Sequence, residues 1–88
     1  MTYLLFTLPN CSQCDALKKT LANSQLNGEE FNLVKPEGKK KLREYIKHIK
    51  RDDKGSVILP TLLLLEGDEV KNVLNSSGEF ENWLKSKD

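Results

Sequence analysis

The sequence predicts an α/β fold in which helices cover a four-stranded mixed sheet. Short apolar, β-rich runs alternate along the chain with segments whose apolar residues recur at helical spacing. The predicted order is strand, helix, strand, helix, two strands and helix. The chain of 88 residues is long enough for one hydrophobic core and contains no linker that would separate two domains. We therefore expect a single domain over residues 1–88.

A strand and a helix are predicted at the start of the chain. Residues 2–8 contain the apolar run Tyr3–Phe6, and Pro9-Asn10 interrupts it. The helical pattern covers residues 12–23, where three side chains share one apolar face: Cys14, Leu17 and Leu21. This order places Cys11 at the start of a helix that directly follows a buried strand.

A second strand and a second helix are predicted next. Asn27-Gly28 is typical of a turn, and the β-rich run Phe31–Val34 is closed by Pro36. Strand, helix and strand in this order predict a βαβ unit with a right-handed crossover. A helix is expected over residues 37–51, closed by Asp53-Lys54-Gly55. Its apolar residues recur at helical spacing: Leu42, Tyr45, Ile46 and Ile49.

The last part of the chain predicts a β-hairpin and a final helix. Thr61–Leu65 is a strongly apolar strand, and Val70–Leu74 is its return after the turn Glu66–Glu69. Ser76 and Glu79 have the spacing of a capping box, which opens a helix. That helix presents three apolar side chains on one face: Phe80, Trp83 and Leu84.

The composition indicates one small domain of the cytoplasm, and we expect the protein to be a monomer. The net charge is +1, so no overall field favours a nucleic acid or a membrane surface as a partner. Two cysteines are too few for a secreted disulfide scaffold. No apolar run approaches the ~20 residues needed to span a bilayer, and the N-terminus lacks a signal-peptide pattern.

Cys11-Ser-Gln-Cys14 is the motif that carries chemistry. Two cysteines at this spacing can cycle between a dithiol and a disulfide. Cys11 lies at a predicted helix start, where free backbone N–H groups and the helix dipole favour a thiolate. Cys14 lies one turn further along the predicted apolar face. We expect Cys11 to attack a substrate disulfide and Cys14 to resolve the mixed disulfide.

A metal site is the alternative interpretation of the two cysteines. Four-coordinate zinc needs more ligands than Cys11, Cys14 and the lone His48 can offer in one chain. Two copies of the chain would supply four thiolates, enough to bridge an iron–sulfur cluster in a dimer. A redox role without a bound metal or cofactor is the expectation that we carry forward.

The chain resembles the glutaredoxin branch of the thioredoxin fold over nearly its whole length. The resemblance rests on the element order, on Pro9-Asn10 before the cysteine motif and on Pro60 before the third strand. Within that branch, the motif is most similar to that of the small redoxins that supply electrons to ribonucleotide reductase, which share a glutamine directly before the second cysteine, as Gln13 is here. Those redoxins take their own electrons from thioredoxin reductase. The resemblance thus implies a protein disulfide as substrate and a flavoprotein as reductant.

Three positions depart from the pattern of the resembling family. Leu8 replaces a lysine that in the family helps to hold the active thiolate. Ser76-Ser77 replaces the double glycine of the members that use glutathione, although N–H groups at a helix start still suit a carboxylate. The tail also lacks the Trp-Ser-Gly-Phe signature of the reductase-linked redoxins. A glutathione-dependent glutaredoxin is therefore kept as the alternative function.

The remaining site residues follow from the resemblance. It implies that Pro60 is cis and that the backbone of Leu59 is free to pair with an extended substrate. Ser12 and Gln13 occupy the positions that tune the redox couple, and Ser12 suits an ordinary helix start equally well. Eight residues are expected to contact the substrate: Pro9, Ser12, Gln13, Leu59, Pro60, Thr61, Ser76 and Ser77.

The predicted second helix is basic. Its cations suit either docking on an acidic partner or simple solvation, and surface lysines usually serve solvation. They are Lys39, Lys40, Lys41, Arg43, Lys47, Lys50 and Arg51. His48 lies beside the apolar stripe of this helix, as a surface imidazole.

Overall fold

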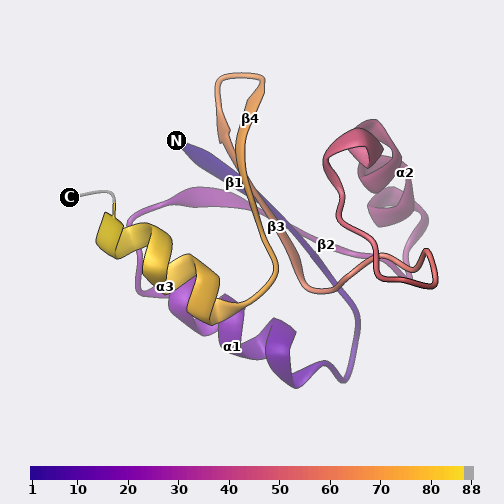
Figure 1. The fold of residues 1–88 in the computed structure, drawn as a ribbon, viewed down its shortest axis with the longest axis horizontal. Coiled ribbons are helices and arrows are strands. Elements are labelled where there is room, and N and C mark those ends of the chain that lie inside the picture. Colours follow the sequence, from indigo (N-terminus) through magenta and orange to yellow (C-terminus); the bar gives the residue numbers. More distant parts are fainter. Residues whose placement is uncertain (87–88) are drawn as a thin grey trace.

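A mixed sheet lies between helices on both of its faces (Figure 1). The computed structural model describes residues 1–86. The elements are β1 (Thr2–Thr7), α1 (Ser12–Ala22), β2 (Asn27–Asn32), α2 (Pro36–Glu44), the 3-10 helix η1 (Ile46–His48), β3 (Thr61–Glu66), β4 (Glu69–Leu74) and α3 (Ser77–Ser86). The strand order is β2-β1-β3-β4, with β1 and β2 parallel and the other neighbours antiparallel. This confirms the predicted α/β class, and the arrangement is a thioredoxin-like fold.

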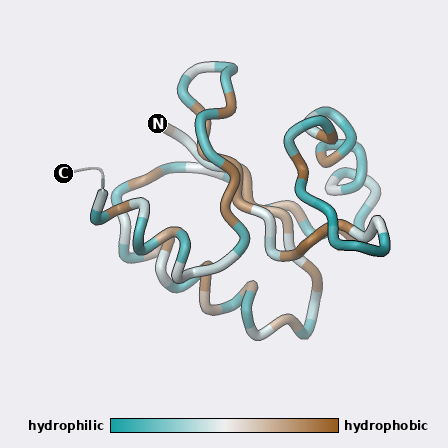
Figure 2. Tube along the Cα trace, viewed as in Figure 1, coloured by the Kyte–Doolittle hydropathy of each residue, from teal (hydrophilic) through white to brown (hydrophobic). Residues whose placement is uncertain are grey.

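The alternation of side chains along β1 and β3 divides the core into two clusters. One cluster lies on the face covered by α1 and α3: Leu5, Leu17, Leu21, Leu62, Leu64 and Phe80. The other lies on the face covered by α2: Phe6, Ile49, Leu63 and Leu65. Successive residues of a strand point to opposite faces, so the apolar run of β3 is buried on both sides. Figure 2 shows the corresponding apolar band through the centre of the sheet.

The second strand lies earlier in the chain than the sequence pattern predicts. β2 begins at Asn27, so Asn27-Gly28 is not a turn, and Leu33-Val34 lies beyond the end of the strand. Each β2 residue pairs with β1, from Thr2 opposite Asn27 to Thr7 opposite Asn32. This long-range pairing overrides the local turn preference. Glycine is required in the strand, because a Cβ atom at Gly28 would overlap Tyr3.

The second helix is shorter than predicted. It ends at Glu44, and η1 follows, where a continuous helix over residues 37–51 was expected. The chain beyond Ile49 is instead extended, because Arg51 forms an antiparallel bridge with Val57 and Ile58 N donates to Lys50 O at 3.1 Å. Pairing between these two segments satisfies backbone groups that a longer helix would have used internally.

The capping pattern at the start of α3 is confirmed. Glu79 N donates to Ser76 Oγ at 3.1 Å, which satisfies one of the free N–H groups of the helix. Glu79 Oε2 in turn accepts a hydrogen bond from Asn75 N at 3.1 Å. The cap thereby ties the end of β4 to the beginning of α3.

Gly38 is expected to resist substitution although it lies in a helix. A Cβ atom at this position would overlap the backbone carbonyl of Asn32, against which α2 packs. We therefore expect Gly38→Ala to lower the free energy of unfolding by about 1–3 kcal/mol, although alanine is the better helix former. Chemical denaturation measures the change.

Gly78→Ala in α3 is the matched control. Its Cβ atom would meet only Ser76 Oγ, at 3.8 Å, which is an ordinary contact. We expect this variant to raise the free energy of unfolding by up to about 1 kcal/mol. Equal effects of the two substitutions would contradict the packing argument.

Candidate functional site

The pairing of the strands brings the expected site residues to one end of the sheet. Phe6 near the end of β1 lies opposite Thr61 at the beginning of β3, and Leu62 lies opposite Leu74 at the end of β4. Three connections therefore lie at the same end of the sheet: the cysteine loop after β1, the loop before β3 and the connection from β4 to α3 (Figure 1). Segments far apart in the sequence form one surface there.

Cys11 is the N-cap residue of α1. Its φ and ψ angles are −114° and 106°, outside the helical region, and its Sγ accepts a hydrogen bond from Cys14 N at 3.1 Å. A sulfur thus occupies the position where serine, threonine or aspartate usually cap a helix. In the reduced protein, the same N–H group and the helix dipole favour the negative charge of a thiolate at Cys11.

The two cysteines form a disulfide, and their exposures differ. Their Cα atoms are 5.2 Å apart. Cys11 is partly exposed, whereas Cys14, on the buried face of α1, is 1% exposed. Asn10 has a positive φ of 58° and turns the chain from β1 into the helix, a conformation that asparagine tolerates better than most residues. Because Cys14 is buried, a disulfide of another protein can reach only Cys11 Sγ from solvent.

The loop before β3 contains the expected proline geometry. The peptide bond between Leu59 and Pro60 is cis, as the resemblance implied. Pro60 is buried and Leu59 is partly buried. Thr61 is completely buried, and its Oγ1 donates a hydrogen bond of 2.6 Å to Ile58 O. This hydrogen bond of Thr61 helps to fix the loop before β3.

The other expected contact residues differ in how much they can offer a substrate. Pro9, Ser12 and Gln13 are exposed on the cysteine loop and the first turn of α1. Ser76 and Ser77 are partly buried, and the Ser76 hydroxyl is engaged in the cap of α3. A substrate would therefore find the Ser76 hydroxyl already bonded within the protein.

Asn75 is a site residue that the sequence analysis missed. Its side-chain Nδ2 donates to Ile58 O at 3.2 Å and to Pro60 O at 3.1 Å, and lies 3.4 Å from Thr61 Oγ1. The end of β4 thereby holds the loop that contains Pro60. The position of Asn75 next to the capping box was visible in the sequence, but no local pattern reveals a bond that spans 15 or 17 residues.

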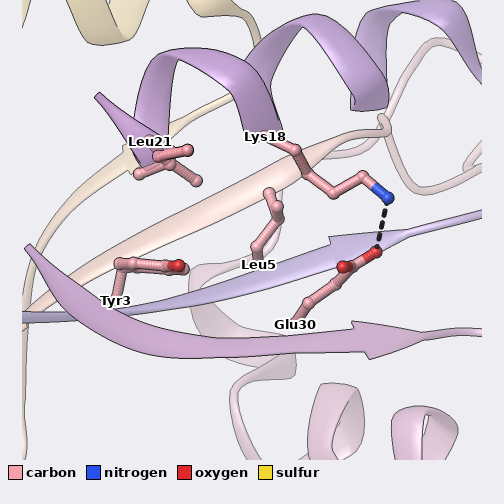
Figure 3. Close-up of a pocket in the computed structure, with 6 residues that line it drawn as sticks. Tyr3, Leu5, Lys18, Leu21 and Glu30 are labelled. Carbon is pink, nitrogen blue, oxygen red and sulfur yellow. Dashed lines mark ion pairs between the residues drawn. The ribbon is translucent and has the colours of Figure 1, made fainter. Parts of the chain in front are cut away.

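A separate pocket lies between α1 and the edge strand β2, away from the cysteines. It has a volume of about 200 Å³ and is lined by Tyr3, Leu5, Lys18, Leu21, Ala22 and Glu30. Figure 3 shows Lys18 Nζ beside Glu30 Oε2, at 3.2 Å. The hydrogen bond to Glu30, and then the charge of Glu30, raise the pKa of Lys18 above the ordinary 10.5. None of the expected site residues lines this pocket.

The described part of the chain contains neither a cluster of metal-ligand side chains nor a membrane-spanning helix. Within residues 1–86, no group of three or more histidine, cysteine, aspartate or glutamate side chains could hold a metal ion. Over the same residues, every helix is too short or too polar to cross a bilayer.

Comparison with known proteins supports the fold. No protein-family model and no curated protein sequence matches the chain. A solved structure described as that of a malarial protein superposes with a TM-score of 0.61, over 98% of this chain and 97% of that chain. The two sequences are 18% identical, so the likeness is one of fold alone.

Asn75→Ala is expected to loosen the loop before β3. The variant loses the bonds to Ile58 O and Pro60 O, so we expect the free energy of unfolding to fall by about 1–3 kcal/mol. Hydrogen exchange of the backbone amides in residues 57–61 should accelerate as well, which mass spectrometry measures.

Asn72→Ala, on the same strand, is the matched control. The Asn72 side chain makes no hydrogen bond within residues 1–86. This variant should leave both the exchange of residues 57–61 and, within about 0.5 kcal/mol, the stability unchanged. Unaltered exchange in the Asn75 variant would show that the amide does not hold the loop.

Proposed function

We propose that the protein is a dithiol–disulfide oxidoreductase that reduces disulfide bonds of other proteins. One observation carries the proposal: a disulfide joins the partly exposed Cys11, at the N-terminus of α1, to the buried Cys14. An accessible sulfur that is stabilised as an anion suits nucleophilic attack, and a sheltered second sulfur suits resolution. The resemblance to glutaredoxins, which rests on the cysteine motif and on Pro60, also supports this proposal.

The reaction transfers two electrons in two exchange steps. The Cys11 thiolate attacks one sulfur of the substrate disulfide, whose bond breaks while a Cys11–substrate disulfide forms; the released sulfur takes up a proton. Cys14 then loses its proton and attacks Cys11 Sγ, which forms the Cys11–Cys14 bond and releases the second substrate sulfur as a thiol. The substrate disulfide is reduced to two thiols, and the protein dithiol is oxidised.

A two-electron reductant must restore the dithiol. We propose a flavoprotein disulfide reductase of the thioredoxin reductase type for this step, with glutathione as the alternative. Gln13 before Cys14, and Ser76-Ser77 in place of a double glycine, support the flavoprotein. The same resemblance makes ribonucleotide reductase the candidate substrate.

The roles of the two cysteines can be separated by alkylation and trapping. In the reduced protein at neutral pH, we expect iodoacetamide to modify Cys11 at least about ten times faster than Cys14, because Cys11 is accessible and favoured as a thiolate. Cys14→Ser should accumulate a mixed disulfide with an oxidised protein substrate, and mass spectrometry should locate it at Cys11.

Cys11→Ser is the matched control for this experiment, since it retains one thiol. It should neither form the mixed disulfide nor reduce the substrate. Faster alkylation of Cys14, or trapping through Cys14, would refute the assigned roles.

A coupled assay distinguishes the two reductants. With NADPH and thioredoxin reductase we expect sustained reduction of an insulin disulfide substrate, with a rate at least about ten times that obtained with glutathione and glutathione reductase. Both systems consume NADPH, so the fall in NADPH absorbance measures the rate of disulfide reduction in each of them. Turnover with glutathione and glutathione reductase, and none with thioredoxin reductase, would contradict the flavoprotein as reductant and favour a glutathione-dependent glutaredoxin.

A further inference from the structure

The pocket between α1 and the edge strand β2 takes no part in the proposed thiol chemistry, because neither cysteine lines it. Leu5 of β1 and Leu21 of α1 contribute to its apolar surface, and they are 1% and 3% exposed. Both residues belong to the core cluster on the face covered by α1 and α3. The pocket therefore opens onto the hydrophobic core, whose packing fixes its apolar wall.

Two small residues leave this space open. Gly28 of β2 pairs with Tyr3 of β1, and the absence of a Cβ atom at Gly28 gives the Tyr3 side chain room beside the edge strand. Ala22, the last residue of α1, lines the pocket with an exposed methyl group. A larger side chain at Ala22 can therefore enter the pocket without displacing a core residue.

The charged side chains of the pocket are already paired. Figure 3 shows Lys18 and Glu30 at one end of the pocket and Tyr3 at the other. Lys18 Nζ lies 3.2 Å from Glu30 Oε2 and 3.7 Å from Asp15 Oδ1, which is outside the pocket. Glu30 Oε2 also accepts a hydrogen bond of 2.8 Å from Thr7 Oγ1. An ionic group of a ligand at this end would meet a like charge as well as an opposite one, so its net attraction is small.

The Tyr3 hydroxyl is the polar group that remains for a ligand. It makes no hydrogen bond within residues 1–86. Figure 3 shows this hydroxyl on the side of the ring that faces the ion pair. A phenolic hydroxyl both donates and accepts hydrogen bonds. The pocket thus combines an apolar surface with one neutral group that can orient a ligand.

We propose that this pocket binds a small uncharged aromatic molecule that has a single ring and one hydrogen-bonding group. Its volume of about 200 Å³ exceeds the ~150 Å³ of an engineered protein cavity that holds benzene. The same volume is below the ~300 Å³ at which sites for drug-sized ligands begin. The ring would pack against Leu5, Leu21 and the ring of Tyr3, and its polar group would bond the Tyr3 hydroxyl. This binding site is separate from the proposed oxidoreductase function and does not depend on it.

Titrations followed by amide-resolved NMR of the isotope-labelled full chain test the proposal. Three probes share one ring and differ in the charge of the substituent: benzyl alcohol, benzoate and benzylammonium. The oxidised protein is used, so that the Cys11–Cys14 disulfide excludes thiol chemistry. Benzyl alcohol should bind with a Kd on the order of 1 mM. The two ions should bind at least about fivefold more weakly, because they lose water without gaining an unpaired counter-charge.

The signals that shift on binding should be those of the residues that line the pocket: 3, 5, 18, 21, 22 and 30. Ala22→Leu should weaken the binding of benzyl alcohol at least about tenfold, because the added side chain occupies the ligand's space. Tyr3→Phe keeps the ring and removes the hydroxyl, so it should weaken binding about threefold to tenfold.

Ala16→Leu is the matched control, because Ala16 is an exposed alanine of the same helix that does not line the pocket. Its affinity for benzyl alcohol should equal that of the wild type within about twofold. Absent or unsaturable shifts, shifts that map elsewhere, or undiminished binding by the Ala22 variant would overturn the site. Equal affinity for either ion would overturn the ligand class, and full affinity of the Tyr3 variant would overturn the assigned hydrogen bond. None of these results bears on the exchange reactions of Cys11.

Discussion

The hydrogen bond from Cys14 N to Cys11 Sγ is the contact on which the proposed chemistry of the site depends. It makes Cys11, the proposed nucleophile, also the cap of the helix, so the start of α1 and the position of this sulfur are coupled. A helix start must satisfy its free N–H groups in any case. Here that requirement supplies an N–H donor for the sulfur of Cys11.

Helix α1 can hold this position because its buried face is anchored in the core. Leu17 and Leu21 pack with Leu5 and with Phe80 of α3. Cys14 is the buried residue nearest the N-terminus of α1. Asn75 completes the site from the other side, since its amide bonds the loop before β3 and its backbone joins the cap of α3. The site is thus supported by the same elements that form the core.

The two faces of the sheet have different chemical character. Four of the 14 lysine and arginine residues lie on α2, on the face opposite to α1, whereas the segments 8–14, 57–61 and 74–78 at the candidate site contain no charged residue.

The sequence by itself determined the elements that have strong local patterns: the apolar strands, the helix after Cys11 and the cap formed by Ser76 and Glu79. These depend on residues close in the chain, so periodicity and spacing reveal them. Only the tertiary structure decided the start of β2, the early end of α2 and the role of Asn75. In two of these cases the deciding contact comes from a partner distant in sequence, β1 for Gly28 and Pro60 for Asn75, and in the third it comes from Val57, which bridges Arg51 across a turn. Local propensity is weaker than such pairing, because buried backbone groups must find partners wherever the fold supplies them.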